Sequence, residues 1–252
     1  MSYAYVLMSY YKKMCNIPGI GTLLRITKSK LRRDRDTFLA RASGIVHVGA
    51  NSGQERALYE RHGLRVLWIE PIPEVFETLK ANLQHYPRQS ALQCLVADQD
   101  ETEYAFHVSN NLGASSSILE LKLHKDIWPD VAYERSITLR AITLASLLKR
   151  ERINPSDFNA LVIDTQGSEL LVLKGTVPIL HAFRFIKIEV PDFESYAGCC
   201  QLTDVEVFLK EHGFQEISRH KFAWRAKGGI YYDIVYENSD GLASDSIGVA
   251  RK

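Results

Sequence analysis

A short glycine-containing segment, Gly49-Ala50-Asn51-Ser52-Gly53, has the composition of a ligand-binding turn. It follows the apolar residues 45–48 and precedes a stretch with helical spacing, so it joins a predicted strand to a predicted helix. Glycines at such a junction let the backbone turn sharply and approach a ligand closely. The spacing is one residue tighter than the dinucleotide-binding GxGxxG pattern, which suits a ligand without phosphate, such as the amino-acid part of S-adenosylmethionine. A structural turn with no ligand is the alternative.

Two acidic residues follow the next two predicted strands and have the chemistry to bind a nucleoside. Glu70 ends an apolar run 21 positions after Gly49, and its carboxylate can accept hydrogen bonds from both ribose hydroxyls. NAD enzymes and methyltransferases share this arrangement, so Glu70 indicates a nucleoside without choosing between the two classes. Asp98 follows the third apolar run, where it could meet an adenine amino group or simply belong to an acidic turn.

A further polar segment, residues 164–169, follows the next long apolar run. Asp164 is predicted at the carboxyl edge of the sheet, where open α/β sheets bind their ligands. Ser168 is expected to cap the following helix, and Glu169 to lie in its first turn near the positive end of the helix dipole. Helix capping explains neither Asp164 nor Gln166, so both are candidates for a functional role.

Glu189 ends the following predicted strand and precedes Pro191 and Asp192. An acid at the carboxyl end of a strand can act as a general base or orient a substrate hydroxyl. A purely structural hydrogen-bonding role is the alternative.

The elements that must position these residues alternate between strand and helix, which predicts a mostly parallel sheet with helices on both faces. Residues 102–109 are predicted as an edge strand or a hairpin arm. The polar residues 109–118 are a linker by default, or a loop over the ligand if functional. The predicted strands are 44–50, 64–70, 91–97, 136–142, 159–164, 184–190, 214–220 and 229–238, the last one antiparallel, and the predicted helices are 52–63, 73–86, 144–150, 168–175 and 203–214.

The chain is predicted to contain a helical extension over residues 1–42, an α/β domain over 43–238 and a flexible tail over 239–252. Its 252 residues suffice for one sizeable α/β domain, and a formal net charge of +1 gives no electrostatic case for nucleic acid. None of the four cysteines has CxxC spacing, which favours a reducing compartment and no structural zinc. No apolar stretch is long enough to span a bilayer and the N-terminus is a poor signal peptide, so we expect a cytoplasmic protein.

Several of these segments, in this order, resemble the FkbM family of methyltransferases. The matching segments are HVGANSGQE, WIEP with PEVFETLKANL, the SNN and ASSSI loop, ITLASLL, and LVIDTQGSELLVLKG. The resemblance extends from about residue 45 to residue 233. It implies the Rossmann-like class I methyltransferase fold, an α/β fold with a seven-stranded, mostly parallel sheet. It also implies S-adenosylmethionine as methyl donor and O-methylation of a sugar, a glycan or a related natural product.

Carried over position by position, the resemblance places the cofactor in the loop after the first strand, its ribose at Glu70 and its adenine near Asp98. Many relatives have an aspartate at the position of His47, which either faces the methionine end of the cofactor or packs within its strand. The predicted cofactor-binding residues are His47, Gly49, Ala50, Asn51, Gly53, Glu70, Pro71, Asp98, Ser116, Asp164 and Gln166.

The expected reaction is direct displacement of the methyl group by an acceptor hydroxyl, which needs a base during attack. Asp164 and Glu189 are the first candidates for that base and Glu169 is the next. A divalent metal is a further option, because Asp164 and Glu169 could supply oxygen ligands, but two carboxylates are too few to predict a metal site.

Two other functions compete with methyl transfer. One is an NAD-binding oxidoreductase, against which the loop spacing argues. The other is a non-catalytic methyltransferase-like module. The basic residues 28–35 either form a solvated helix face or contact an anionic surface such as a membrane. The tyrosine-rich N-terminal residues are candidates for a homodimer contact.

Overall fold

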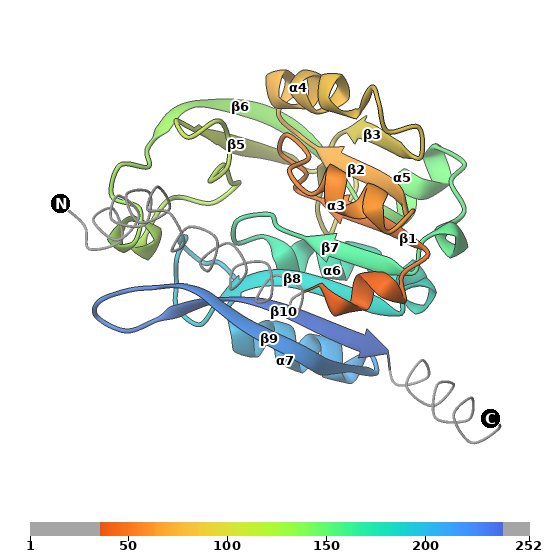
Figure 1. Ribbon diagram of the computed structural model, residues 1–252. Helices are drawn as coiled ribbons and strands as arrows, with labels where there is room; N and C mark the ends of the chain where they lie inside the picture. The colour runs from red at the N-terminus through yellow and green to blue at the C-terminus, as the bar shows by residue number, and fades with distance from the viewer. Residues whose placement is uncertain (1–35, 239–252) are drawn as a thin grey trace, which may run out of the picture. The chain divides into compact units, whose positions relative to one another are not determined.

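The computed structural model describes residues 36–238, which include a seven-stranded sheet (Figure 1). The strand order is β3-β2-β1-β7-β8-β10-β9, and β10 runs antiparallel to both of its neighbours. This is the mostly parallel, seven-stranded class I arrangement that the family resemblance implies. The strands of this sheet are β1 (Gly44–Val48), β2 (Arg65–Glu70), β3 (Gln89–Gln93), β7 (Ala160–Ile163), β8 (Phe185–Pro191), β9 (Phe214–Trp224) and β10 (Ile230–Asn238).

The chain divides into two compact units, residues 1–38 and 39–252, and the fold described here belongs to the second. A 3-10 turn, Thr37–Ala40, spans the boundary. The predicted helical extension over 1–42 lies mostly outside the described residues, and the basic residues 28–35 and the predicted flexible tail over 239–252 lie wholly outside them.

The central strands are buried along their whole length because helices cover both faces of the sheet. Every residue of β1 and of β7 is buried. One face, with Val46 and Val48, packs with α5, α6 and α7 into the largest apolar cluster. On the opposite face, Tyr59 of α3 packs against Trp68 of β2. The helices are α3 (Arg56–Arg61), α4 (Pro73–Leu83), α5 (Leu144–Arg150), α6 (Glu169–Thr176) and α7 (Leu202–Glu211), with 3-10 helices Leu123–Asp126, Pro155–Asp157 and Val177–Ala182.

A second, three-stranded sheet is built from β4 (Leu95–Val96), β5 (Glu103–Ser109) and β6 (Tyr133–Ile142). The long strands β5 and β6 form an antiparallel pair and β5 lies at the edge of this sheet, so 102–109 is an edge strand. The prediction of one strand over 91–97 is wrong. The chain leaves the main sheet after Gln93, and Leu95 and Val96 pair with β6 instead. Gln93 is the one polar residue in this run, and nothing else in the run marks the change of pairing partner.

The helix predicted over 52–63 is shorter than expected and begins at Arg56. Asn51 and Gly53 both have left-handed backbones, with φ of +44° and +71°, and a right-handed helix cannot include them. The predicted stop at Gly63 is confirmed. Its φ is +68°, its N–H bonds to the carbonyl of Glu60, and the N–H of Leu64 bonds to the carbonyl of Tyr59, as in a Schellman motif.

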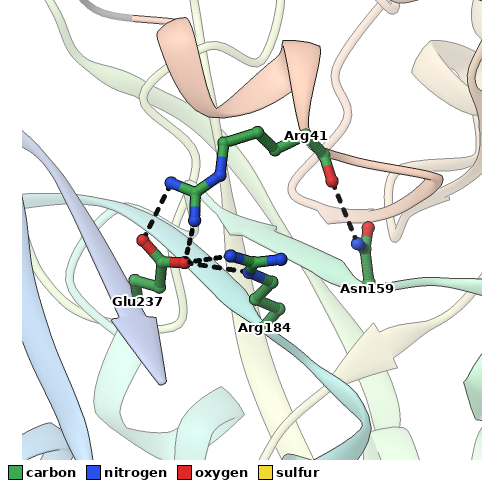
Figure 2. Close-up of polar contacts among 4 residues, drawn as sticks. All are labelled: Arg41, Asn159, Arg184 and Glu237. Carbon is green, nitrogen blue, oxygen red and sulfur yellow. Dashed lines mark hydrogen bonds and ion pairs between the residues drawn. The ribbon is translucent and has the colours of Figure 1, made fainter. Parts of the chain in front are cut away.

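A buried acid ties the end of β10 to the first residues of the α/β unit (Figure 2). Glu237 is fully buried and accepts hydrogen bonds from the guanidinium groups of Arg41 and Arg184. The Nε of Arg184 lies 2.8 Å from Glu237 Oε1, and a nitrogen of Arg41 lies 3.0 Å from Oε2. The side-chain amide of Asn159 donates to the carbonyl of Arg41 at 3.3 Å. Four segments that are distant in sequence are therefore joined at the amino edge of β7 and β8.

Among residues 36–238, no helix combines the length and the apolar character that a membrane crossing needs.

Candidate active site

The loops that follow β1 and β7 meet at the centre of the sheet's carboxyl edge. The strands β1 and β7 are neighbours, although β2 and β3 lie on the other side of β1, so the strand order reverses here. The backbone N–H of Asp164 bonds to the carbonyl of Val48 at 3.0 Å. Ligands of open α/β sheets bind at this kind of switch point.

Gly49 is required where these two loops touch. Its φ is +84°, and a Cβ atom added there would lie 1.8 Å from the carbonyl oxygen of Asp164. The N–H groups of Gly49 and Ala50 both bond to the carbonyl of Ile69, each at 3.0 Å, which fixes the turn against β2. Gly53 packs closely as well, since a Cβ atom there would lie 2.8 Å from a methyl group of Leu79.

Glu70 is held at the end of β2 by two backbone donors. Its Oε2 accepts from the N–H of Asn51 at 2.8 Å, and its Oε1 accepts from the N–H of Ile72 at 2.9 Å. Burial raises the pKa of Glu70 to about 7 in spite of these two bonds, and Glu74 adds slightly to the rise. A carboxylate has about four acceptor positions, so lone pairs remain for two further donors such as hydroxyls.

His47 lies below the loop and within the sheet. Its ring stacks on Trp68 with centroids 4.8 Å apart, and its Nδ1 lies 3.2 Å from the hydroxyl of Tyr59. Burial, reinforced by the charge of Lys187, lowers the pKa of His47 to about 3, so the ring is neutral. The structure thus places this side chain among aromatic neighbours under α3.

Three acids lie side by side at the ends of β7, β8 and β10. Asp233 is the register partner of Glu189, and Asp164 directly follows Ile163, the partner of Ile188. Residues in register point to the same face of a sheet, so Asp164, Glu189 and Asp233 form a row across adjacent strands. The sequence predicted two members of this row, and Asp233 is the third.

The pKa of Asp164 is raised towards neutral pH. Its pKa is raised to about 7, mainly by burial, and a hydrogen bond from Gln166 opposes the rise. The nearby carboxylates of Glu169, Asp233 and Glu55 add to the rise. Asp164 is nevertheless only half-buried, so a reactant can reach it. A carboxyl group that titrates near neutral pH is suited to accept a proton during a reaction.

Glu189 experiences the same acidic surroundings more strongly. Burial raises its pKa well above the usual range, and the charges of Asp164 and Asp233 raise it further, whereas Lys187 opposes them. Adjacent carboxyl groups of this kind resist losing both protons, so one of the pair retains a proton over a wider pH range. Near neutral pH, Asp164 is therefore ionised more readily than Glu189.

Glu169 lies at the start of α6 and is fully buried, with its carboxylate folded back onto its own loop. Its Oε1 accepts from the N–H groups of Thr165 and Gly167, each at 3.0 Å, and the thiol of Cys200 bonds to Oε2. The expected cap by Ser168 is wrong, because its hydroxyl donates to the carbonyl of Thr165 and makes no cap bond. The carboxylate of Glu169 satisfies the free N–H groups of this turn instead.

Gln166 connects the acidic row to a buried tyrosine. Its Nε2 donates to Oδ1 of Asp164 at 2.6 Å, and its Oε1 accepts from the hydroxyl of Tyr196 at 2.8 Å. Its φ of +54° is unusual for a residue with a side chain. Sequence reasoning grouped Gln166 with the cofactor and missed Tyr196.

The polar loop over residues 109–117 touches both loops of the site. Asn51 donates from Nδ2 to the carbonyl of Leu112 at 3.0 Å, and Ser117 donates to the carbonyl of Gln166 at 2.8 Å. Ser116 is buried and accepts from the N–H of Ser109, so its hydroxyl organises the loop itself. The geometry therefore matches a loop that borders the ligand site.

The other two predicted cofactor residues lie towards the second sheet. Pro71 lines a cavity of about 260 Å³ together with Gln93, Cys94 and Arg140. Asp98 follows β4 and accepts a hydrogen bond of 3.4 Å from the hydroxyl of Tyr104.

Within residues 36–238, no three histidine, cysteine, aspartate or glutamate side chains are grouped so that they could hold a metal ion.

Sequence reasoning missed Glu55, Asp233 and Tyr196. Glu55 lies inside the quoted segment HVGANSGQE and is close enough to influence Asp164. Asp233 is an isolated acid in the apolar strand GIYYDIVYEN, which is a readable signal. Tyr196 lies in a loop with no periodicity, so nothing in the sequence indicates its partner.

Solved structures with a similar arrangement include several methyltransferases. A precorrin-6y C5,15-methyltransferase from Geobacter metallireducens has a TM-score of 0.45 and 12% identity, over 81% of this chain and 87% of that one. The 1,6-didemethyltoxoflavin-N1-methyltransferase of Burkholderia thailandensis, with S-adenosylhomocysteine bound, has a TM-score of 0.42 and 14% identity, over 94% and 89%. The N-terminal domain of EvdMO1, in the presence of S-adenosylhomocysteine and D-fucose, has a TM-score of 0.45 and 10% identity, over 82% of each chain. None reaches a TM-score of 0.5, so none supports a substrate or a residue role.

No curated protein matches this sequence. The family model described as the methyltransferase FkbM domain matches residues 47–216, which is more than half of the chain and includes both loops of the site. This match decides between the nucleoside-binding classes that Glu70 alone left open: the chain is a methyltransferase and belongs to the FkbM family.

Proposed function

We propose that this protein transfers the methyl group of S-adenosylmethionine to a hydroxyl group of a sugar, a glycan or a related natural product, with Asp164 as the base. The observation that carries the proposal is the position of Asp164. It lies against the glycine loop that would hold the cofactor, and it is half-buried beside two further acids. The acceptor class is what membership of the FkbM family leads us to expect.

The residues at the switch point fit S-adenosylmethionine. The absence of a side chain at Gly49 lets the loop after β1 lie directly against the Asp164 carbonyl, and Glu70 keeps free acceptor positions for two ribose hydroxyls. When bound, S-adenosylmethionine supplies a methyl group activated by a positively charged sulfur. Asn51 bonds to the carbonyl of Leu112 and so holds the two loops together. Glu70 and Asn51 would orient the cofactor, and the loop over 109–118 would exclude water from it.

Asp164 would accept the proton of the acceptor hydroxyl during attack. Because its pKa is raised to about 7, a sizeable fraction of Asp164 is ionised at neutral pH and can accept a proton. Protonated Asp164 is then a weak enough acid to keep that proton. Glu189 and Asp233 lie next in the row and can accept hydrogen bonds from neighbouring hydroxyls of a polyhydroxylated acceptor. Three carboxylates together disfavour an anionic acceptor at this site.

Binding of S-adenosylhomocysteine, measured by calorimetry with NAD as the control ligand, tests the cofactor. We expect micromolar affinity for S-adenosylhomocysteine, its loss in Glu70→Ala, and no binding of NAD. A folded sample that binds neither ligand, or that prefers NAD, would overturn the proposal.

Methyl transfer tests the acceptor. Radiolabelled S-adenosylmethionine would be incubated with a panel of neutral and anionic polyhydroxylated compounds, amines and thiols, and transfer to a neutral hydroxyl compound is expected. If S-adenosylhomocysteine binds and every acceptor stays unlabelled, including amines and thiols, a non-catalytic methyltransferase-like module becomes the better reading. A homodimer and a membrane contact remain predictions, because both were drawn from N-terminal residues outside the described range.

A further inference from the structure

Tyr196 lies beside the candidate base, and the function proposed above gives it no role. Its side chain is completely buried in the segment between β8 and α7. Its ring packs against His124 with centroids 5.0 Å apart, and burial raises the pKa of its hydroxyl, which is therefore a neutral donor. The hydroxyl lies 2.8 Å from Gln166 Oε1 and 3.4 Å from the carbonyl of Ser115, so the bond to Gln166 is the stronger one.

Gln166 has both ends of its side-chain amide in use. Oε1 faces the Tyr196 hydroxyl, and Nε2 faces Asp164 Oδ1 at 2.6 Å. The backbone carbonyl of Gln166 also accepts a hydrogen bond from the Ser117 hydroxyl at 2.8 Å, so the backbone of Gln166 is held in place as well as its side chain. One N–H of Nε2 and one lone pair of Oε1 are therefore already used within the protein.

We propose that Tyr196 is a positioning residue: its hydroxyl orients the Gln166 amide, and Gln166 in turn holds Asp164 Oδ1 so that the other oxygen can face the acceptor hydroxyl. This inference rests on the proposed function, because it assumes that Asp164 is the base. An amide can rotate by 180° with little change in shape, and the rotated form turns its oxygen towards the Asp164 carboxylate. A donor fixed at Oε1 stabilises the orientation in which the amide nitrogen faces Asp164.

The hydrogen bond that the Gln166 amide donates to Asp164 matters because the charged groups that act on Asp164 are acids. The groups that act on Asp164 are Glu55 from the loop after β1, Glu169 from α6, Glu189 from β8 and Asp233 from β10, and all four are acids. Lys187, on the same face, acts on Glu189. All four acids favour protonated Asp164, and the Gln166 N–H favours the carboxylate. Loss of that donor therefore leaves Asp164 protonated to a higher pH, where it cannot accept a proton.

The test measures Asp164 itself and needs no acceptor. The full chain is prepared with carboxyl-labelled ¹³C aspartate, the Asp164 signal is assigned from its loss in Asp164→Asn, and its titration is followed by NMR. The variants are Gln166→Leu and Tyr196→Phe. The matched control is Tyr133→Phe, which removes another partly buried hydroxyl whose 2.5 Å bond goes to the carbonyl of Leu119.

Gln166→Leu removes the charge-assisted hydrogen bond to Asp164, so the midpoint of the Asp164 titration is expected to rise by about one pH unit. Tyr196→Phe only weakens that bond, so the expected rise is about half as large. Tyr133→Phe should leave the midpoint unchanged. S-adenosylhomocysteine affinity in Tyr196→Phe should stay within about threefold, because neither Tyr196 nor the Gln166 amide contacts the cofactor in this scheme.

An unchanged Asp164 midpoint in Tyr196→Phe, with the variant shown to be folded by its unfolding midpoint, would overturn the inference. An equal shift in Tyr133→Phe would overturn it too, because the effect would then not depend on the contact with Gln166. The proposed function fails by a different result, namely full methyl transfer by Asp164→Asn. Loss of transfer in Asp164→Asn together with an unchanged midpoint in Tyr196→Phe keeps the proposed function and rejects this inference alone.

Discussion

Carboxylates at the carboxyl edge of this sheet differ in how many hydrogen-bond donors surround them. Glu169 is fully buried and is satisfied by backbone N–H groups of its own loop, which makes it part of the scaffold. Asp164 is half-buried, with Gln166 as its side-chain donor. Glu70 lies between these two cases in its number of donors, because each of its oxygens accepts one backbone N–H. A buried carboxylate with unused acceptor positions gains most from a ligand that supplies donors, so Glu70 and Asp164 are the places to test function.

Replacement of Asp164 by asparagine is expected to lower methyl transfer by a factor of at least about 100, the usual contribution of a general base. The change keeps the shape of the side chain, so the protein should remain folded and should bind S-adenosylhomocysteine within a few-fold of the unchanged protein. Radiolabel transfer and calorimetry measure the two quantities. Glu77→Gln, at an exposed residue paired with Lys80 on α4, is the control and should behave as the unchanged protein. Turnover by Asp164→Asn within twofold of normal would rule out Asp164 as the base.

Cofactor affinity should depend on pH through Glu70. The carboxylate accepts hydroxyl donors in its ionised form, and its pKa is raised to about 7, so binding should strengthen as pH rises through 7. Between pH 6 and pH 8 the ionised fraction increases roughly tenfold, which limits the gain in affinity for S-adenosylhomocysteine to about that factor. Calorimetry across this range measures it, and the residual binding of Glu70→Ala should be flat. Affinity of the unchanged protein that stays constant, or that falls with pH, contradicts this assignment.

At the scale of elements, the turn after β1 and the turn after β7 are built as a pair. Gly49 belongs to one and Asp164 to the other, and the contact between them requires a residue without a side chain. The sequence predicted each turn from its glycines and from the alternation of strand and helix. It did not predict that β3 and β4 separate at Cys94, or that Tyr196 reaches Gln166. Local periodicity predicts an element, but the choice of partner depends on residues far away in the chain, which periodicity does not contain.

Gly49→Ala tests the paired turns, and the chain supplies a matched control. Gly49 and Gly213 have nearly equal φ values of +84° and +81°, but a Cβ atom at Gly213 meets nothing within 4 Å. Gly213→Ala should therefore lose only the backbone preference, about 1 kcal/mol of unfolding free energy. Gly49→Ala must also displace the Asp164 carbonyl, so we expect a loss of at least about 3 kcal/mol and loss of S-adenosylhomocysteine binding. Denaturant unfolding of both variants decides the matter, and equal losses would show that the contact between the turns is unimportant.

At the scale of the whole α/β unit, one buried ion cluster joins a residue near the start of the unit to a residue near the end of its last strand. Glu237, near the end of β10, binds Arg184 just before β8 and Arg41 just before β1. These residues lie at the amino edge of β7 and β8, at the opposite end of the strands from Asp164 and Glu189. Under the proposed function, this cluster lies at the opposite end of the strands from the reaction, so a change in the cluster should alter stability without altering cofactor binding.

Glu237→Ala is expected to lower the unfolding free energy by about 2–4 kcal/mol, because it leaves the partly buried guanidinium groups of Arg41 and Arg184 without their anion. Glu77→Gln removes only an exposed pair and should change it by less than about 1 kcal/mol. Denaturant unfolding measures both, and the fraction of Glu237→Ala that remains folded should bind S-adenosylhomocysteine normally. A stability loss no larger than that of Glu77→Gln would mean that the cluster contributes little.

The place of β10 has a consequence for synthesis on the ribosome. This strand emerges after every other strand of the sheet, yet it lies inside the sheet between β8 and β9. Until residues 230–238 are outside the exit tunnel, β8 remains an open edge and β9 has nothing to pair with. A nascent chain that stops earlier lacks both Asp233 and Glu237 and displays unpaired backbone groups, which chaperones and proteases recognise. Completion of the sheet therefore coincides with completion of the acidic row.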